Sequence, residues 1–256
     1  MKVLIVGSGG REHAIAFACA KSPKVDKIYC APGNAGIAQI AECVPIGAME
    51  FDKLVDFAKS NAIDLTVIGM DDPLVGGIVD VFEKEGLRVF GPRKNAAILE
   101  GSKAFSKELM RKYNIPTAAY ETFTSADDAC RYLETADYPI VLKADGLALG
   151  KGVIICNTKD EAMAGVKTLM TDKQFGDAGN TIVIEEFMTG REVSVLSFVD
   201  GNTSRSCLRH RITSVPRTVT RDSIQAAWVI FHQVRSTPRK LINSAKNIYI
   251  RQRLMP

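Results

Sequence analysis

The sequence predicts an α/β protein in which a parallel-sheet N-terminal domain precedes a second, mixed domain. In the first hundred residues, short apolar runs such as Lys2–Val6 and Asp64–Gly69 alternate with helical patterns. Such alternation is typical of an open parallel sheet covered on both faces. Further on, a lysine- and glycine-rich hairpin at Lys143–Val153 joins two apolar strands. From Thr203 the composition changes, because all 20 glycines precede that residue.

Each expected strand of the N-terminal domain ends in a polar or glycine-rich turn. The strands are predicted at Lys2–Val6, Lys27–Cys30, Asp64–Gly69 and Leu87–Phe90. Three helices are predicted between these strands. The first begins near His13, and the other two cover Phe51–Ala62 and Asp72–Glu85. Ligands of parallel sheets bind beyond the carboxyl ends of the strands. Those ends carry Gly7–Glu12, Gly33–Gly36, Asp71–Pro73 and Gly91–Pro92.

The first of these turns, Gly7–Glu12, is a candidate phosphate site. Strand, glycine turn and helix present backbone N–H groups at a helix start, where an anion is stabilised. The turn lacks the third glycine of the dinucleotide-binding fingerprint, and no acid follows the second strand to hold a ribose. A dehydrogenase is therefore disfavoured, and a purely structural glycine turn is the alternative.

The second domain is predicted to follow a linker, Ala96–Lys103, which opens a helix that continues to Tyr113. The remaining elements, in chain order, are a strand at Tyr120–Phe123, a helix at Ala126–Thr135, strands at Tyr138–Leu142 and Val153–Cys156, a helix at Lys159–Thr171, and strands at Thr181–Met188 and Gly190–Val199. Asp200–Asn202 is predicted to be a hairpin turn after the last strand.

The hairpin between the two middle strands has the composition of a phosphate-binding loop. Gly146, Gly150 and Gly152 let backbone N–H groups approach an anion, and Lys143 and Lys151 supply compact positive charge. No Gly-Lys-Ser/Thr follows and the next element is a strand, so the loop is not a P-loop. An ordinary glycine-rich hairpin with surface lysines is the alternative interpretation.

Composition excludes several classes of protein. With 256 residues and 46% hydrophobic content the chain suits one large or two ordinary soluble domains. No apolar run approaches the roughly 20 residues of a membrane span. The six cysteines are scattered without zinc-like spacing, so a reduced, cytoplasmic chain with no protein-held metal is expected. A monomer is expected, with neither membrane nor nucleic acid as a partner.

Five segments, taken together, resemble the ATP-grasp ligases and, among them, the phosphoribosylamine–glycine ligase family of purine biosynthesis. They are Val3–His13, Ala31–Gly36, Gly101–Phe105, Lys143–Val153 and Ile184–Ser194. They span nearly all of residues 1–202 in the order that the family has. The resemblance implies a parallel-sheet pre-ATP-grasp domain at 1–101 and an incomplete ATP-grasp domain at 102–202. The composition of residues 203–256 indicates a basic tail, which is expected to be out of frame and poorly ordered.

The resemblance also implies a reaction. It is the ATP-dependent ligation of glycine to 5-phosphoribosylamine through a glycyl phosphate, giving glycinamide ribonucleotide, ADP and phosphate. ATP and Mg²⁺ are the implied cofactors. Another ATP-grasp carboxylate–amine ligase and a non-catalytic ATP-binding remnant are the alternatives.

Site residues follow from the matching motifs. Lys103 and Lys143 would contact ATP phosphates, and Gly146, Gly150, Lys151 and Gly152 would belong to a mobile lid. The strand with Glu185, Glu186 and Met188 would bind adenine through its backbone, and Glu192 would bind the ribose. Gly9, Gly10, Arg11 and Glu12 would hold phosphoribosylamine. No catalytic residue is assigned, and solvated or locally paired side chains are the alternative for Lys103, Arg11, Glu185 and Glu186.

The tail departs from the family. Thr203–Pro256 holds 11 of the 33 Lys and Arg residues but only one acid, Asp222. No residues there match the magnesium ligands of the family. A weak or inactive chain is therefore expected. A one-base deletion near the codon of Thr203 would explain the composition. In the shifted frame, Arg217–Val229 becomes compatible with the family phrase DGDQGLNTGGMG. The rival interpretation is a genuine basic extension that binds nucleic acid or an acidic partner.

Overall fold

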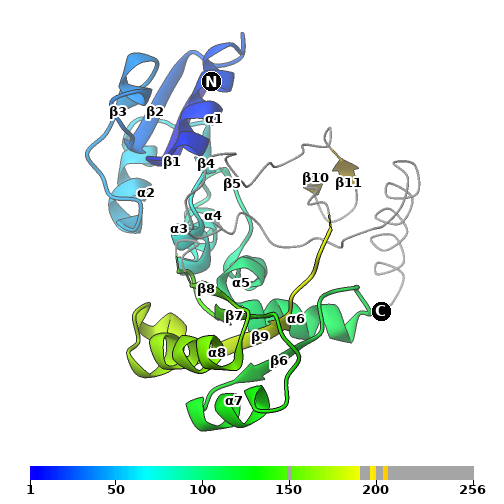
Figure 1. Ribbon diagram of the computed structural model, residues 1–256. Helices are drawn as coiled ribbons and strands as arrows, with labels where there is room; N and C mark the ends of the chain where they lie inside the picture. The colour runs from blue at the N-terminus through cyan, green and yellow to red at the C-terminus, as the bar shows by residue number, and fades with distance from the viewer. Residues whose placement is uncertain (149–151, 191–196, 200–203, 207–256) are drawn as a thin grey trace. The chain divides into compact units, whose positions relative to one another are not determined.

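The computed structural model describes residues 1–148, 152–190, 197–199 and 204–206. The chain divides into two compact units, Met1–Gly101 and the part from Ser102 onward (Figure 1). The first unit contains a parallel sheet and the second an antiparallel one, which confirms the predicted α/β class. Each unit has its own hydrophobic core.

The first unit is built on a five-stranded parallel sheet in the order β3-β2-β1-β4-β5. Its strands are β1 (Lys2–Gly7), β2 (Lys27–Pro32), β3 (Glu42–Cys43), β4 (Leu65–Ile68) and β5 (Val89–Phe90). Its helices are α1 (Gly10–Ala20), the 3-10 turn η1 (Ile37–Gln39), α2 (Phe51–Ser60), α3 (Asp71–Gly76), α4 (Ile78–Lys84) and α5 (Lys94–Gly101). The predicted strands are therefore present, and the two-residue strand β3 was not predicted.

Alternate residues of β1 face opposite sides of the sheet, as strand geometry requires. Leu4 and Val6 pack into one core with residues of α2 and α4, while Val3 and Ile5 pack into another with Ala16 of α1. Both faces of the sheet are thus covered. This arrangement confirms the layered structure predicted from the apolar runs.

Two predictions about the helices were wrong. A single helix was expected over Asp72–Glu85, but Gly77 adopts φ +96° and ends α3 before α4 begins at Ile78. A left-handed residue cannot continue a helix, and glycine adopts that conformation at little cost. The expected linker Ala96–Lys103 is mostly helix α5, which runs from Lys94 to Gly101.

The second unit contains a four-stranded antiparallel sheet in the order β6-β9-β7-β8. The strands are β6 (Tyr120–Phe123), β7 (Ile140–Ala144), β8 (Val153–Cys156) and β9 (Ile182–Glu186). The helices are α6 (Lys103–Lys112), α7 (Ala126–Leu133), α8 (Lys159–Val166), a π-helical turn η2 (Lys167–Thr171) and a 3-10 turn η3 (Gly176–Asn180). Residues of α7, α8 and η2 pack with β7 and β9 in one core.

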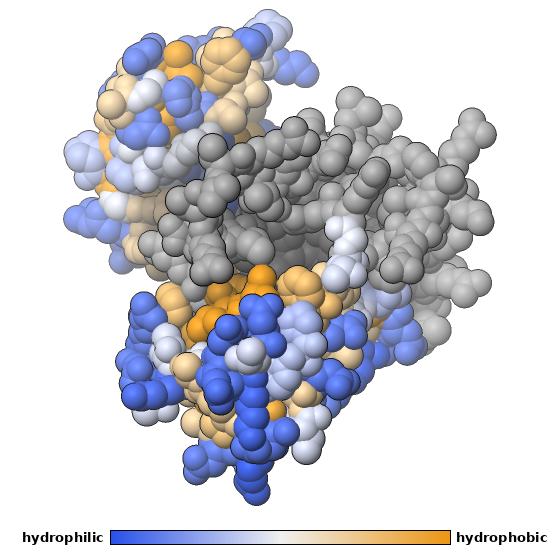
Figure 2. Space-filling model, viewed as in Figure 1, coloured by the Kyte–Doolittle hydropathy of each residue, from blue (hydrophilic) through white to orange (hydrophobic). Residues whose placement is uncertain are grey.

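A short antiparallel hairpin follows, formed by β10 (Ser197–Val199) and β11 (Ser204–Ser206). Its strands bracket the predicted turn at Asp200–Asn202, which itself lies outside the described residues, as does most of the tail after Thr203. Figure 2 shows that hydrophobic side chains gather on one side of the second unit. Phe187 and Met188, which follow β9, are among its exposed large hydrophobic residues.

Candidate functional site

The turn between β1 and α1 is shaped by a buried carboxylate. Glu12 is only 3% exposed, and its Oε2 accepts the Gly9 N–H at 2.5 Å. Its side chain lies against Gly7 and Gly69, where an added Cβ would come within 2.6 Å and 2.2 Å of it. Glu12 therefore caps the start of α1 from inside the fold, in the manner of a capping box.

Arg11 presents the positive charge of this corner. Its Nη1 donates to the Gly69 carbonyl at 2.7 Å and lies 3.3 Å from Asp71 Oδ1, while the side chain is 45% exposed. Gly10 is exposed, with nothing within 4 Å of the place where a Cβ would be. Arg11 and the exposed backbone of Gly9 and Gly10 could face an anion, whereas the carboxylate of Glu12 is turned inward.

The loop after β2 braces the same corner. Asn34 Nδ2 donates to the Ser8 carbonyl at 2.7 Å, and its Oδ1 accepts N–H groups of Gly36 and Ile37. The loops after β1, β2 and β4 therefore meet at the carboxyl edge of the sheet. No role was predicted for Asn34 from the sequence. An asparagine beside glycines is nevertheless a known signal for a turn in which the side chain accepts backbone N–H groups a few residues on.

In the second unit, Asp145 fastens the base of the glycine-rich hairpin to helix α6. Its Oδ1 accepts the Ala104 N–H at 2.6 Å, its two carboxylate oxygens lie 3.1 Å from Ser102 Oγ, and its carbonyl accepts the Lys103 N–H. Lys103 Nζ donates to the Gly146 carbonyl at 3.1 Å. The start of α6 and the start of the hairpin are thus one hydrogen-bonded frame. Sequence reasoning missed Asp145.

The glycines at the two ends of the hairpin have a packing role. A Cβ on Gly146 would lie 2.9 Å from Ala178 Cβ, and one on Gly152 would lie 2.7 Å from Ala148 Cβ. Gly152 also accepts the Ala144 N–H at 2.8 Å through its carbonyl. Both positions therefore need glycine for close approach. Gly150 and Lys151 lie outside the described residues.

Two lysines share one buried carboxylate beside this frame. Glu185 Oε2 lies 2.9 Å from Lys143 Nζ and 3.2 Å from Lys107 Nζ. The side chains of Lys107 and Glu185 are each 7% exposed, whereas that of Lys143 is 25% exposed. Burial lowers the pKa of Lys107 below its usual value, although Glu185 opposes the shift. Lys107 was not predicted, because nothing in its local sequence distinguishes it from a surface lysine of a helix.

Two other residues predicted to bind the nucleotide lie at the end of β9. Glu186 is the last residue of this strand and pairs with Ile140 of β7, and Met188 follows two residues later. Glu186 is exposed and Met188 is 41% exposed. Glu192 lies outside the described residues. The structure therefore brings Lys103, Lys143, Gly146, Gly152 and Glu185 together around one hairpin base, with Glu186 and Met188 at the end of the adjoining strand.

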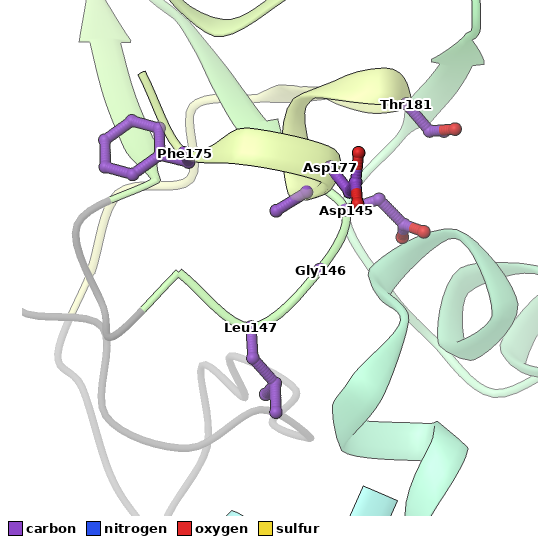
Figure 3. Close-up of a pocket in the computed structure, with 7 residues that line it drawn as sticks. Asp145, Gly146, Leu147, Phe175, Asp177 and Thr181 are labelled. Atoms are coloured by element: carbon purple, nitrogen blue, oxygen red, sulfur yellow. The ribbon is translucent and has the colours of Figure 1, made fainter. Parts of the chain in front are cut away.

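A cavity of about 320 Å³ opens beside the start of the hairpin (Figure 3). Its lining includes Asp145, Gly146, Leu147, Phe175 and Thr181. This volume is at the lower end of the range for small-molecule sites.

The described residues contain no group of three or more His, Cys, Asp or Glu side chains able to hold a metal ion.

Comparison with known families decides the relationship. The model of the phosphoribosylglycinamide synthetase N domain matches residues 1–100, and that of the ATP-grasp (A) domain of the same synthetase matches residues 101–212. The chain belongs to the phosphoribosylglycinamide synthetase family. The two domain models match in succession and meet between residues 100 and 101.

Individual relatives support this membership of the phosphoribosylglycinamide synthetase family. The chain is 53% identical over 203 residues to phosphoribosylamine–glycine ligase of Halalkalibacterium halodurans, covering 79% of this chain and 47% of that protein. It is 51% identical over 203 residues to the Escherichia coli enzyme of the same name, with 78% and 47% covered. The chain thus spans about half the length of these curated relatives.

One solved structure of a phosphoribosylamine–glycine ligase supports the same family. The crystal structure of phosphoribosylamine–glycine ligase from Thermotoga maritima superposes with a TM-score of 0.66 at 35% identity, covering 80% of this chain and 49% of that one. Biotin carboxylase from Campylobacter jejuni superposes with a TM-score of 0.65 at 17% identity, covering 80% of this chain and 49% of that one. At that identity the second likeness shows a shared fold alone.

Among the described residues, no helix has the length and hydrophobicity to cross a membrane.

Proposed function

We propose that this chain supplies the phosphoribosylamine-binding and part of the ATP-binding machinery of a phosphoribosylamine–glycine ligase. In that reaction an oxygen of the glycine carboxylate attacks the γ-phosphorus of ATP, forming glycyl phosphate and releasing ADP. The amine of 5-phosphoribosylamine then attacks the acyl carbon. An amide bond forms, and phosphate and a proton leave. The family membership over both matched domains supports this assignment.

The observation that carries the nucleotide part is the position of the two lysines. Lys103 lies at the start of α6 with its Nζ on the hairpin base, and Lys143 lies on β7 just before that hairpin. Two ammonium groups on one frame suit a polyphosphate, since phosphoryl transfer depends on positioning and charge neutralisation. We assign phosphate contacts to Lys103, Lys143 and the glycine hairpin, and adenine contacts to the backbone from Glu185 to Met188.

We assign the N-terminal corner to the phosphate of phosphoribosylamine. Gly9 and Gly10 are exposed at the start of α1, where the N–H of Gly9 is already donated to Glu12, and Arg11 adds a cation. Glu12 would act there through the shape of the turn, because its carboxylate is occupied by the Gly9 N–H. Glu192 is retained as the proposed ribose ligand, although it lies outside the described residues.

We propose that the 256-residue chain binds ATP but turns over weakly or not at all, since Asp222 is the only acid in residues 203–256 and no residues there match the magnesium ligands of the family. A cytoplasmic monomer without nucleic-acid or membrane partners completes the proposal. Calorimetric titration with ATP tests the binding, with Lys143→Met expected to lose it and the exposed Lys112→Met expected to keep it. No ATP binding by the wild-type chain would refute the proposal.

Release of ADP separates the related functions. Dependence on glycine plus phosphoribosylamine would identify the ligase, and dependence on another carboxylate and amine would identify a different ATP-grasp ligase. Binding of ATP without release of ADP under any combination is expected for a non-catalytic nucleotide-binding remnant. Full-strength turnover by this chain would contradict the expected loss of activity.

A further inference from the structure

The cluster of Lys107, Glu185 and Lys143 has more positive than negative charge. Both ammonium groups contact the same oxygen, Oε2 of Glu185, at 3.2 Å and 2.9 Å. Lys107 also donates to Thr117 Oγ1 at 2.8 Å and to the Ala118 carbonyl at 3.4 Å. It therefore approaches the carboxylate from a fixed position on α6, while Lys143 approaches it from β7.

Of the two lysines in the cluster, Lys143 is the one that solvent can reach. Two cations and one anion leave a balance of one positive charge, and charges in a buried setting interact more strongly than they do in water. Lys107 is nearly inaccessible, whereas a quarter of the Lys143 side chain is exposed. An anion entering from solvent would therefore meet Lys143 first.

We propose that Lys107 is a positioning residue for polyphosphate binding, because its positive charge offsets the Glu185 carboxylate and so leaves the cluster a net positive charge beside Lys143, which a nucleotide phosphate can contact. This inference rests on the proposed function, in which Lys143 contacts ATP. Without Lys107, Lys143 and Glu185 would form a neutral pair. Polyphosphate competes with Glu185 for the Lys143 ammonium group in either case, but without Lys107 it would approach a pair that has no net charge.

A purely structural role for Lys107 predicts a different pattern among variants. If the cluster only stabilised the fold, removal of Glu185 would weaken binding at least as much as removal of Lys107, because each change leaves a buried charge without its partner. If the charge balance governs binding, Glu185→Gln raises the surplus, Lys107→Met removes it, and the double variant restores it. The double variant also leaves no buried charge unpaired by the loss of its partner.

The test is calorimetric titration of the full chain and its variants with inorganic tripolyphosphate and with ATP. Tripolyphosphate reports the phosphate contacts without an adenine contribution. We expect K107M to weaken tripolyphosphate binding about tenfold, roughly 1.4 kcal/mol. E185Q should bind at least as tightly as wild type, and K107M/E185Q should return to within about threefold of it. Lys107→Arg, which keeps the charge, should retain affinity.

Thermal unfolding of each variant distinguishes loss of the fold from loss of affinity. If K107M does not fold, E185Q and the double variant still decide the matter, because weaker binding by both would overturn the inference. Equal affinity of wild type and K107M would overturn it while leaving the proposed function intact. Failure of the wild-type chain to bind ATP or tripolyphosphate would overturn both.

Discussion

At the scale of single residues, Glu12 links the candidate phosphate corner to the stability of the fold. Its carboxylate is buried and accepts the Gly9 N–H. We expect Glu12→Ala to lower the unfolding free energy by about 2–3 kcal/mol, because the Gly9 N–H loses a hydrogen bond to a charged acceptor. Chemical denaturation would measure this change. The exposed Glu42, paired with Lys27, provides the control: Glu42→Ala should change stability much less, and equal effects would contradict the internal-cap role.

Lys107 gives a pH-dependent prediction with a defined sign. Burial lowers its pKa, Glu185 and Glu186 oppose that shift, and Lys143 adds to it; Tyr120 and Arg111 also lie nearby. As the pH rises through the lowered pKa, Lys107 loses its proton and the cluster loses its surplus charge. Tripolyphosphate affinity should therefore fall, as the pH is raised from neutral toward the ordinary lysine pKa of about 10.4, more steeply in wild type than in Lys107→Arg, because arginine stays charged. Parallel curves would contradict this prediction.

At the scale of elements, Asp145 joins helix α6 to strand β7. It accepts the Ala104 N–H and the Ser102 hydroxyl, and Ser102 in turn caps the helix by accepting the Phe105 N–H. Asp145→Ala should destabilise the second unit by about 2–3 kcal/mol, since it leaves two donors, the Ala104 N–H and the Ser102 hydroxyl, without their acceptor. Ser125→Ala, which removes only the cap of α7, should cost about 1 kcal/mol.

Hydrogen exchange measures where the effect of Asp145→Ala is located. Amides of α6 and of the first residues of the hairpin should exchange faster in that variant, whereas amides of α7 should not. In Ser125→Ala the pattern should be reversed. Faster exchange of all elements alike in Asp145→Ala would indicate global destabilisation, and the proposed link between α6 and β7 would be wrong.

Strands whose local residue types and flanking turns signal them were predictable from the sequence, whereas features decided by a single backbone angle or by tertiary contact were not. Strands such as Tyr120–Phe123 and Val153–Cys156 matched their expected bounds. The break at Gly77 was missed because one isolated glycine in a helical pattern gives no sign of its φ angle. Lys107 and Asp145 were missed because their roles depend on neighbours more than ten residues away.

At the scale of the whole molecule, the first unit contains all five strands of its sheet and both of its cores within Met1–Gly101. A protein made of residues 1–101 alone should therefore fold. We expect a cooperative thermal transition and the circular dichroism spectrum of an α/β protein. A spectrum without secondary structure would show that the unit needs the rest of the chain.

The proposed frameshift after Thr203 concerns residues that lie almost entirely outside the described structure. The curated relatives in Halalkalibacterium halodurans and Escherichia coli each align with 203 residues of the chain. Resequencing the coding DNA across the Thr203 codon should reveal one missing base whose restoration produces the family phrase. If the frame stands as written, the basic tail is genuine, and its binding to nucleic acid or acidic proteins becomes the question to measure.

The position of β1 in its sheet sets an order of events during synthesis. This strand pairs with β2 on one side and β4 on the other, and it precedes both in the chain. At roughly 5–20 residues per second on the ribosome, the interval between β1 and β4 lasts several seconds. Throughout that time an apolar strand has at least one open edge. Ribosome-associated chaperones should therefore contact nascent chains that end before Leu65 more strongly than those that extend beyond Ile68.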